Sequence, residues 1–172
     1  MQYKASLDNS TKAITALVLI LIVAVVSYRI KLQIGFTPDI STALAHSGII
    51  ILLGAVVIGS YLYAPTAYRV DDDFLTIVRP VYNKKIKMHD IIALREMTDT
   101  EVFGAIRALG NGGLFGYYGK YYVPKLGWAT FYATQRRNRI LITTQQGKKI
   151  MLTPDDLAML DEMKAKLSAN KV

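Results

Sequence analysis

Two long uncharged apolar stretches constrain this chain more than any other feature of its sequence. The first runs from Ala13 to Tyr28 and is bracketed by Lys12 and Arg29. It is slightly shorter than the roughly 17–25 residues of a spanning helix. However, the stems of Lys12 and Arg29 can lie in the apolar layer while their charges reach the headgroups. A cleaved signal peptide is the alternative, although no small-residue cleavage pattern ends the stretch. We predict a membrane span over about 13–30.

The second stretch is uncharged from Ser47 to Tyr68. The triplet Thr37-Pro38-Asp39 ahead of it is typical of a helix start, with a hydroxyl cap, a proline and an acid in the first turn. Its tyrosines near the far end resemble an interfacial aromatic belt. A buried core helix is the alternative, but the stretch is too long for most cores. We predict a second span over about 44–64.

Two spans joined by a short loop form a transmembrane hairpin over residues 13–64, preceded by a leader over 1–12. Lysine and arginine are more abundant beside the outer ends of the spans than in the connecting loop, which favours both termini on the cytoplasmic side. Small residues in the second span permit close helix approach or contact with a partner helix, or are simply common in such helices. These are Gly48, Gly54, Ala55 and Gly59.

Composition is consistent with a membrane protein and excludes some chemistry. The chain is 52% hydrophobic, carries a net charge of +8 and contains no cysteine. Disulfides, thiolate metal sites and cysteine nucleophiles are therefore excluded. The positive charge favours anionic partners such as lipid headgroups, nucleic acid or an acidic protein.

Residues 65–172 predict a β domain that ends in a helix. Short runs of β-branched and aromatic residues, separated by turn residues, are typical of a small antiparallel barrel or sandwich. The expected strands are 67–70, 74–80, 84–88, 91–97, 114–122, 127–134, 138–144 and 148–152, with 98–113 unassigned. Thr153 and Pro154 are suited to start a helix over 154–168. Its apolar stripe would close one end of the barrel.

These residues resemble the membrane-anchored type of bacterial pleckstrin-homology (PH) domain protein. The resemblance covers roughly Tyr68 to Leu167 and rests on YRVDDDFLTIVRP, MHDI, GNGGLFGYYGKY, TFYAT and RILITTQQGKKIMLTPDD. It implies an all-β, PH-like antiparallel barrel or sandwich closed by the C-terminal helix, in the bacterial plasma (inner) membrane. It implies no particular chemistry. Inositide binding at the first hairpin is not carried over, because its tip is Asp71-Asp72-Asp73.

A glycine- and tyrosine-rich segment, Leu109–Tyr122, is the most unusual part of the β domain. It matches neither a phosphate-binding GxxxxGK[ST] loop nor a dinucleotide fingerprint inside a βαβ unit. A strand with a bulge accounts for it, with its glycines at turns or close approaches. The alternative is an aromatic contact surface for a membrane or partner. Its candidate contact residues are Gly112, Gly113, Tyr117, Tyr118 and Tyr122.

Basic residues cluster at two predicted turns. If successive strands alternate in direction, the turns at 81–83 and 135–137 both face the membrane, and the turns at 71–73 and 145–147 lie at the far end. The proximal cations are then candidates for contact with anionic lipid, although solvated hairpin tips are the alternative. These cations are Lys84, Lys85, Lys87, Arg136, Arg137 and Arg139. Lys148 and Lys149 are expected to be distal.

No residue pattern indicates catalysis. His46 and His89 have no partner at metal-ligand spacing, and no serine lies in a GxSxG motif. We therefore expect no cofactor, metal or catalytic residue, and a non-enzymatic binding module whose partner is membrane lipid or a membrane protein. An accessory or regulatory subunit of a larger membrane complex, or a homo-oligomer, is the alternative. A membrane-bound enzyme is the third possibility, and nucleic acid is not an expected partner.

Overall fold

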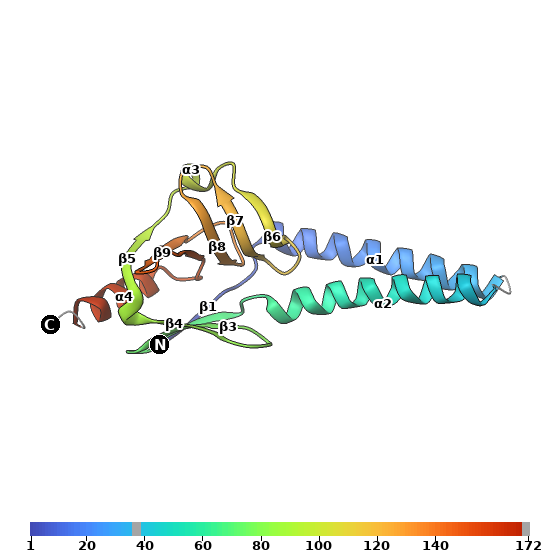
Figure 1. The fold of residues 1–172 in the computed structure, drawn as a ribbon, viewed down its shortest axis with the longest axis horizontal. Coiled ribbons are helices and arrows are strands. Elements are labelled where there is room, and N and C mark those ends of the chain that lie inside the picture. Colours follow the sequence, from blue (N-terminus) through green and yellow to red (C-terminus); the bar gives the residue numbers. More distant parts are fainter. Residues whose placement is uncertain (36–38, 170–172) are drawn as a thin grey trace.

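Two helices project side by side from one end of a β domain (Figure 1). The computed structural model describes residues 1–35 and 39–169. The helices are α1, Asn9–Gly35, and α2, Ile40–Tyr63. Both are long and apolar enough to cross a membrane, and almost none of either is buried within the protein. The alternative of a buried core helix is therefore wrong for α2.

Both helices begin at an aspartate. Asp8 precedes α1, and its Oδ1 accepts the Thr11 backbone N–H at 2.7 Å. Asp39 is the N-cap of α2, where it accepts the Thr42 backbone N–H at 3.3 Å. The cap is therefore the acid of the predicted triplet, whereas Thr37 and Pro38 lie outside the described residues.

The N-terminus belongs to the β domain, because strand β1, Gln2–Lys4, pairs antiparallel with β2, Ala67–Val70. The predicted leader over 1–12 missed this strand. Three residues carry too little alternation to indicate a strand, and the partner strand lies beyond both helices. The pairing places the N-terminus and the β domain at the same end of the two helices (Figure 1).

The strands form two sheets. The first has the order β1-β2-β3-β4, and the second has the order β5-β9-β10-β8-β7-β6. The remaining strands are β3 (Phe74–Val78), β4 (Lys84–Lys87), β5 (Ile91–Glu96), β6 (Ile106–Gly112), β7 (Tyr117–Val123), β8 (Gly127–Ala133), β9 (Ile140–Thr144) and β10 (Lys149–Leu152). A 3₁₀ turn, η1 (Met88–Asp90), precedes β5, and a short helix, α3 (Asp99–Val102), follows it.

The predicted barrel or sandwich is not a closed barrel, and one strand pair is not antiparallel as predicted. The two sheets are separate, and β10 pairs with β8 in parallel. The parallel pair arises because β9 and β10 form a hairpin whose second strand lies beside β8. Residues 134–139 therefore pass the end of β10 instead of making a turn between neighbouring strands. Strand β6, in the segment left unassigned, adds the outer edge of the second sheet.

Apolar side chains cover both faces of the second sheet. On the inner face, Ile140, Ile142 and Leu152 pack toward the first sheet and the C-terminal helix. On the outer face, Phe131, Leu141 and Met151 form a second cluster. Alternate residues of one strand thus serve two cores, as strand geometry requires.

The C-terminal helix α4, Ala158–Ala169, is shorter than predicted. Met159 and Met163 are fully buried in the core between the sheets. Thr153 is not the cap, because its buried hydroxyl accepts the Thr134 backbone N–H at 2.9 Å. The segment between Thr153 and α4 is not helical, and it is held by hydrogen bonds from the Asn138 amide to Asp155 O at 2.8 Å and from the Ser6 hydroxyl to the Asp155 carboxylate.

The small residues of α2 are not packed against α1. A Cβ placed on Gly48, Gly54 or Gly59 would meet nothing within 4 Å. Close approach of the two helices therefore does not account for these glycines, and the partner-helix alternative stays open.

Candidate functional site

The tip of the β6–β7 hairpin joins the β domain to both long helices. The Thr15 hydroxyl of α1 donates to Gly113 O at 3.2 Å and accepts the Phe115 N–H at 3.0 Å. The Phe115 ring also lies edge-on to Tyr61 of α2, with centroids 5.5 Å apart. On the adjoining strand, the Tyr118 hydroxyl donates to Ser60 O, also in α2. The glycine-rich segment thus anchors the domain to the helices.

Gly113 shows why this tip requires glycine. Its φ is +136°, and a Cβ there would lie 3.0 Å from the Ile14 side chain of α1. A side chain would be strained by the backbone and would press against the helix. Tyr118 and Gly113 therefore have packing roles in this structure.

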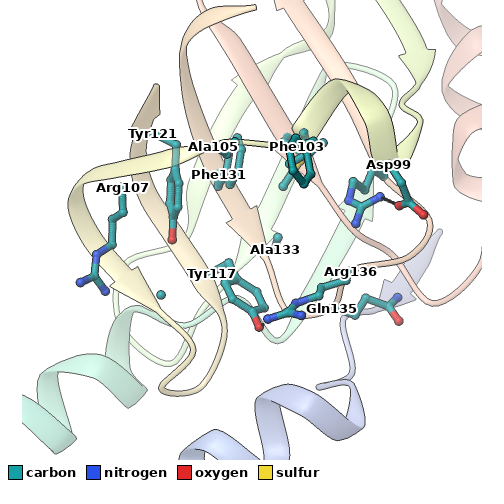
Figure 2. Close-up of a pocket in the computed structure, with 15 residues that line it drawn as sticks. Asp99, Phe103, Ala105, Arg107, Tyr117, Tyr121, Phe131, Ala133, Gln135 and Arg136 are labelled. Carbon is teal, nitrogen blue, oxygen red and sulfur yellow. Dashed lines mark hydrogen bonds and ion pairs between the residues drawn. The ribbon is translucent and has the colours of Figure 1, made fainter. Parts of the chain in front are cut away.

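A pocket of about 640 Å³ lies on the outer face of the second sheet beside this tip. We call it the outer pocket (Figure 2). Its floor is apolar and buried, formed by Tyr121, Phe131, Ala133 and Met151. Residues of α3 and the chain after it, including Phe103, form one wall. Three arginines line the pocket: Arg107, Arg136 and Arg139.

Each arginine is positioned differently. Arg139 forms an ion pair with Asp99 of α3. The Arg136 Nε donates to the Tyr117 hydroxyl at 3.1 Å, and the guanidinium lies 5.4 Å from the centroid of that ring. Arg107 extends over Gly112, where a Cβ would lie 2.8 Å from a guanidinium nitrogen. Glycine at this position therefore leaves room for the arginine.

The floor stays neutral at physiological pH. Tyr121 stacks on Phe131 with ring centroids 4.2 Å apart and an interplanar angle of 9°. Burial raises the pKa of Tyr121 to about 12, while nearby Arg107 acts in the opposite direction. The pocket thus combines an apolar base with a cationic rim that holds one carboxylate, Asp99. That combination suits an anion with an apolar portion.

The outer pocket lies where α1 begins. The Arg136 backbone N–H donates to Asp8 Oδ2 at 3.0 Å, and Asp8 caps α1. Figure 2 shows the side chains of Arg107, Tyr117 and Arg136 on the side of the pocket that faces the two long helices. Residues 135–137, predicted to face the membrane, thus include Arg136 at the end of the β domain where α1 begins.

A second hollow of about 770 Å³ lies between the two sheets, and we call it the intersheet cleft. It opens beside the last turn of α2, at Ser60 and Tyr63. Its charged lining residues are Arg79, Lys84, Lys120 and Lys148.

The structure distributes the predicted contact residues over several places. The outer pocket collects Gly112, Tyr117, Arg136 and Arg139, and the intersheet cleft contains Lys84 and Tyr118. The others line neither hollow. Lys85 lies over the Phe74 ring, Lys87 is exposed on β4, Arg137 is exposed near the start of α1, Gly113 packs under Ile14, and Tyr122 lies edge-on to Trp128.

Sequence reasoning missed Arg107 and Asp99 in the outer pocket, and Arg79 and Lys120 in the cleft. Arg107 lies on β6, which shows no clear alternation. Lys148 was expected at the end of the domain far from the membrane, and Lys84 at the near end. Both nevertheless line the intersheet cleft, with Lys148 in the turn before β10.

Comparison with protein families identifies the β domain. A family model described as bacterial PH domain matches residues 66–167, more than half of the chain. The chain belongs to the bacterial PH domain family. The matched part of the PH domain begins just before β2 and ends in α4, so β1 and both long helices lie outside it. Comparisons with curated proteins and with solved structures gave no match.

Proposed function

We propose that the protein is a membrane-anchored PH module that binds anionic lipid headgroups of the cytoplasmic leaflet at the outer pocket, without catalysing a reaction. The observation that carries the proposal is the cluster of three arginines over an apolar floor at the end of the domain where α1 begins. Guanidinium groups bind phosphate oxygens well, and each cation near an anionic surface contributes about 1 kcal/mol.

The length of α2 supports placing the outer pocket at the depth of the lipid headgroups. Residues Ile40 to Gly59 of α2 precede the contacts with the hairpin tip at Ser60 and Tyr61. At about 1.5 Å per residue, this part of α2 matches a hydrocarbon core of about 30 Å. The tip and the adjacent pocket then lie at the interface, where tyrosines are enriched.

A binding role is also favoured by the side chains available. Within residues 1–35 and 39–169, no group of three or more His, Asp or Glu side chains is placed to hold a metal ion. The carboxylate of the outer pocket, Asp99, is paired with Arg139. A positioned acid–base pair, which hydrolytic chemistry needs, is not seen among the described lining residues.

The test measures lipid retention by the full chain. Protein extracted in mixed micelles of phosphatidylglycerol and phosphatidylcholine is analysed by native mass spectrometry. We expect preferential retention of phosphatidylglycerol, which Arg107→Gln with Arg136→Gln reduces about 30-fold, since two cations contribute about 2 kcal/mol. Lys125→Gln with Lys164→Gln removes the same charge from exposed residues outside both hollows and should change little. Equal retention of the two lipids by the unmodified chain would refute the proposal.

The proposal also requires that the termini and the β domain lie on the cytoplasmic side of the membrane, which a separate experiment tests. A phosphatase fused to the C-terminus should be inactive, whereas one inserted near Thr37 should be active, because the lysine and arginine bias favours cytoplasmic termini. The opposite pattern would place the outer pocket at the other leaflet.

A second candidate is an accessory subunit of a larger membrane complex. The unpacked face of α2 at Gly48 and Gly54 favours it, because small residues permit close contact between helices. Blue-native electrophoresis in mild detergent tests this role. Migration as a lone small species would exclude it.

A further inference from the structure

The intersheet cleft contains an unusual concentration of positive charge. Lys84 comes from β4, Lys120 from β7, and Lys148 from the turn before β10, and Arg79 follows β3. Four separate segments thus direct cations toward one space. No acidic side chain is among the lining residues that the structure describes.

The three lysines have no internal counter-charge. Across residues 1–35 and 39–169, none of their ammonium groups takes part in an ion pair. Among the described residues, Arg95, Arg139 and Lys166 are the lysine or arginine side chains that do have such partners. Like charges around one hollow repel one another, and the repulsion is weakened only by water and salt. An anion in the cleft would remove this cost.

Arg79 is held in place within the cleft. Its Nε donates to Tyr82 O at 3.0 Å, and its guanidinium lies 5.6 Å from the Tyr63 ring and 5.9 Å from the Tyr132 ring. Tyr63 belongs to α2 and Tyr132 to β8, so the arginine bridges the membrane helix and the second sheet. It supplies a fixed positive charge, while the exposed lysines can adjust to a ligand.

The size and walls of the cleft define the ligand class. A volume of about 770 Å³ is within the range of sites for small organic ligands. Lysines bind phosphate as point charges, and three of them with one arginine match a ligand that carries two or more negative charges. Leu109 and Ile150 add apolar walls, and the opening beside Tyr63 leaves access from the membrane side.

We infer that the intersheet cleft is a binding site for a phosphate-bearing anion with at least two negative charges. The ligand is either a soluble phosphate compound or a lipid headgroup with a terminal phosphate. This site is separate from the outer pocket and does not depend on the function proposed for that pocket. It lies on the opposite face of β7 and β8.

The experiment uses the full chain in neutral detergent micelles. Binding of inorganic pyrophosphate is measured by isothermal titration calorimetry, and a second arm measures retention of phosphatidic acid against phosphatidylcholine by native mass spectrometry. Lys120→Gln with Lys148→Gln should weaken binding tenfold or more, because two charge-assisted contacts are lost. Lys125→Gln with Lys164→Gln has the same net charge and should change affinity less than about twofold. The pair Arg107→Gln and Arg136→Gln, in the outer pocket, should leave pyrophosphate binding unchanged.

The outcomes distinguish a soluble ligand from a lipid ligand, and a specific site from an effect of net charge. Binding in the pyrophosphate arm alone indicates a soluble ligand. Retention of phosphatidic acid alone indicates a lipid in the cleft if Lys120→Gln with Lys148→Gln reduces it, and overturns the inference if only Arg107→Gln with Arg136→Gln reduces it. Equal weakening by the cleft pair and the control pair would mean that net charge acts without a site, which overturns the inference. Failure of both arms with the unmodified chain would overturn it as well. Unfolding midpoints measured without anion confirm that each variant is folded.

Discussion

The outer pocket and the intersheet cleft are formed by opposite faces of the same two strands. On β7, Tyr117 and Tyr121 face the outer pocket, whereas Tyr118 and Lys120 face the cleft. The outer pocket has a buried aromatic floor, and Arg139 there is neutralised by Asp99. The lysines of the cleft have no acidic neighbour among the described lining residues.

This difference separates a cation that is paired within the protein, Arg139, from cations that have no acidic partner among the described lining residues. A paired arginine at the rim of a packed surface contributes to the native structure. Three exposed lysines around one hollow, with no ion pair among the described residues, repel one another and slightly reduce stability until an anion binds. Removing a side chain should therefore lower the free energy of unfolding at the outer pocket and raise it at the cleft lysines.

The largest expected effect is on the packed face. Phe131→Ala removes a buried ring that stacks on Tyr121, and it should reduce the free energy of unfolding by about 3–5 kcal/mol. Thr130→Ala, the adjacent residue on the cleft face, should change it by less than about 1 kcal/mol. Urea unfolding of the full chain in micelles, followed by the fluorescence of Trp128, measures both. Similar small losses at both positions would show that the outer floor is not a packed core.

Removing single cations should give effects of opposite sign. Lys120→Met should raise the free energy of unfolding by a few tenths of a kcal/mol at low salt, since it relieves repulsion in the cleft, and added salt should abolish the gain. Arg139→Met should lower it by about 0.2–1 kcal/mol, because the Asp99 side chain is 89% exposed and the ion pair is screened by water. The same urea titration at two salt concentrations measures both effects. Destabilisation by Lys120→Met would contradict the view that the cleft is electrostatically strained.

The sequence predicted the two apolar helices and the hairpin of β2 and β3 because those features are local. Periodicity and turn residues next to each strand carry the information. Strand β6 was missed because its Gly-Asn-Gly end shows no alternation and becomes a strand only by pairing with β7. The parallel pairing of β8 with β10 was missed for a related reason, since it depends on the order in which distant strands assemble.

The sites were predictable only in part. Arg136 and Tyr117 attracted attention because the basic turn and the tyrosine segment are unusual in composition. Their proximity was not predictable, because Arg136 lies in the segment after β8 and Tyr117 begins β7, and the pairing of β7 with β8 brings the two together. The cleft was missed because it lies between two sheets whose relative placement depends on tertiary packing, and the predicted barrel or sandwich did not specify it.

The last prediction concerns a pH-dependent effect in α3, which forms a wall of the outer pocket. Glu101 accepts the Thr98 backbone N–H at 2.9 Å and a guanidinium N–H of Arg95 at 2.6 Å. The hydrogen bond from Arg95 and that from the Thr98 backbone lower the pKa of Glu101 to about 2. The stabilisation is therefore complete above about pH 4.5, where the unfolded carboxyl is ionised, and disappears as pH falls toward about 2.

Glu101→Gln should accordingly lower the free energy of unfolding by about 0.5–1 kcal/mol at neutral pH, the range for a helix cap and an exposed ion pair. The deficit should shrink as the pH is lowered from about 4.5 to about 2, because the unmodified carboxyl becomes protonated and loses the same interactions. Urea titrations of both proteins across this range measure the deficit. Glu96→Gln, an exposed acid on β5, is the matched control and should show no comparable change with pH. A deficit that stays constant down to pH 2 would mean that Glu101 acts by shape alone, and the wall of the outer pocket would not depend on its charge.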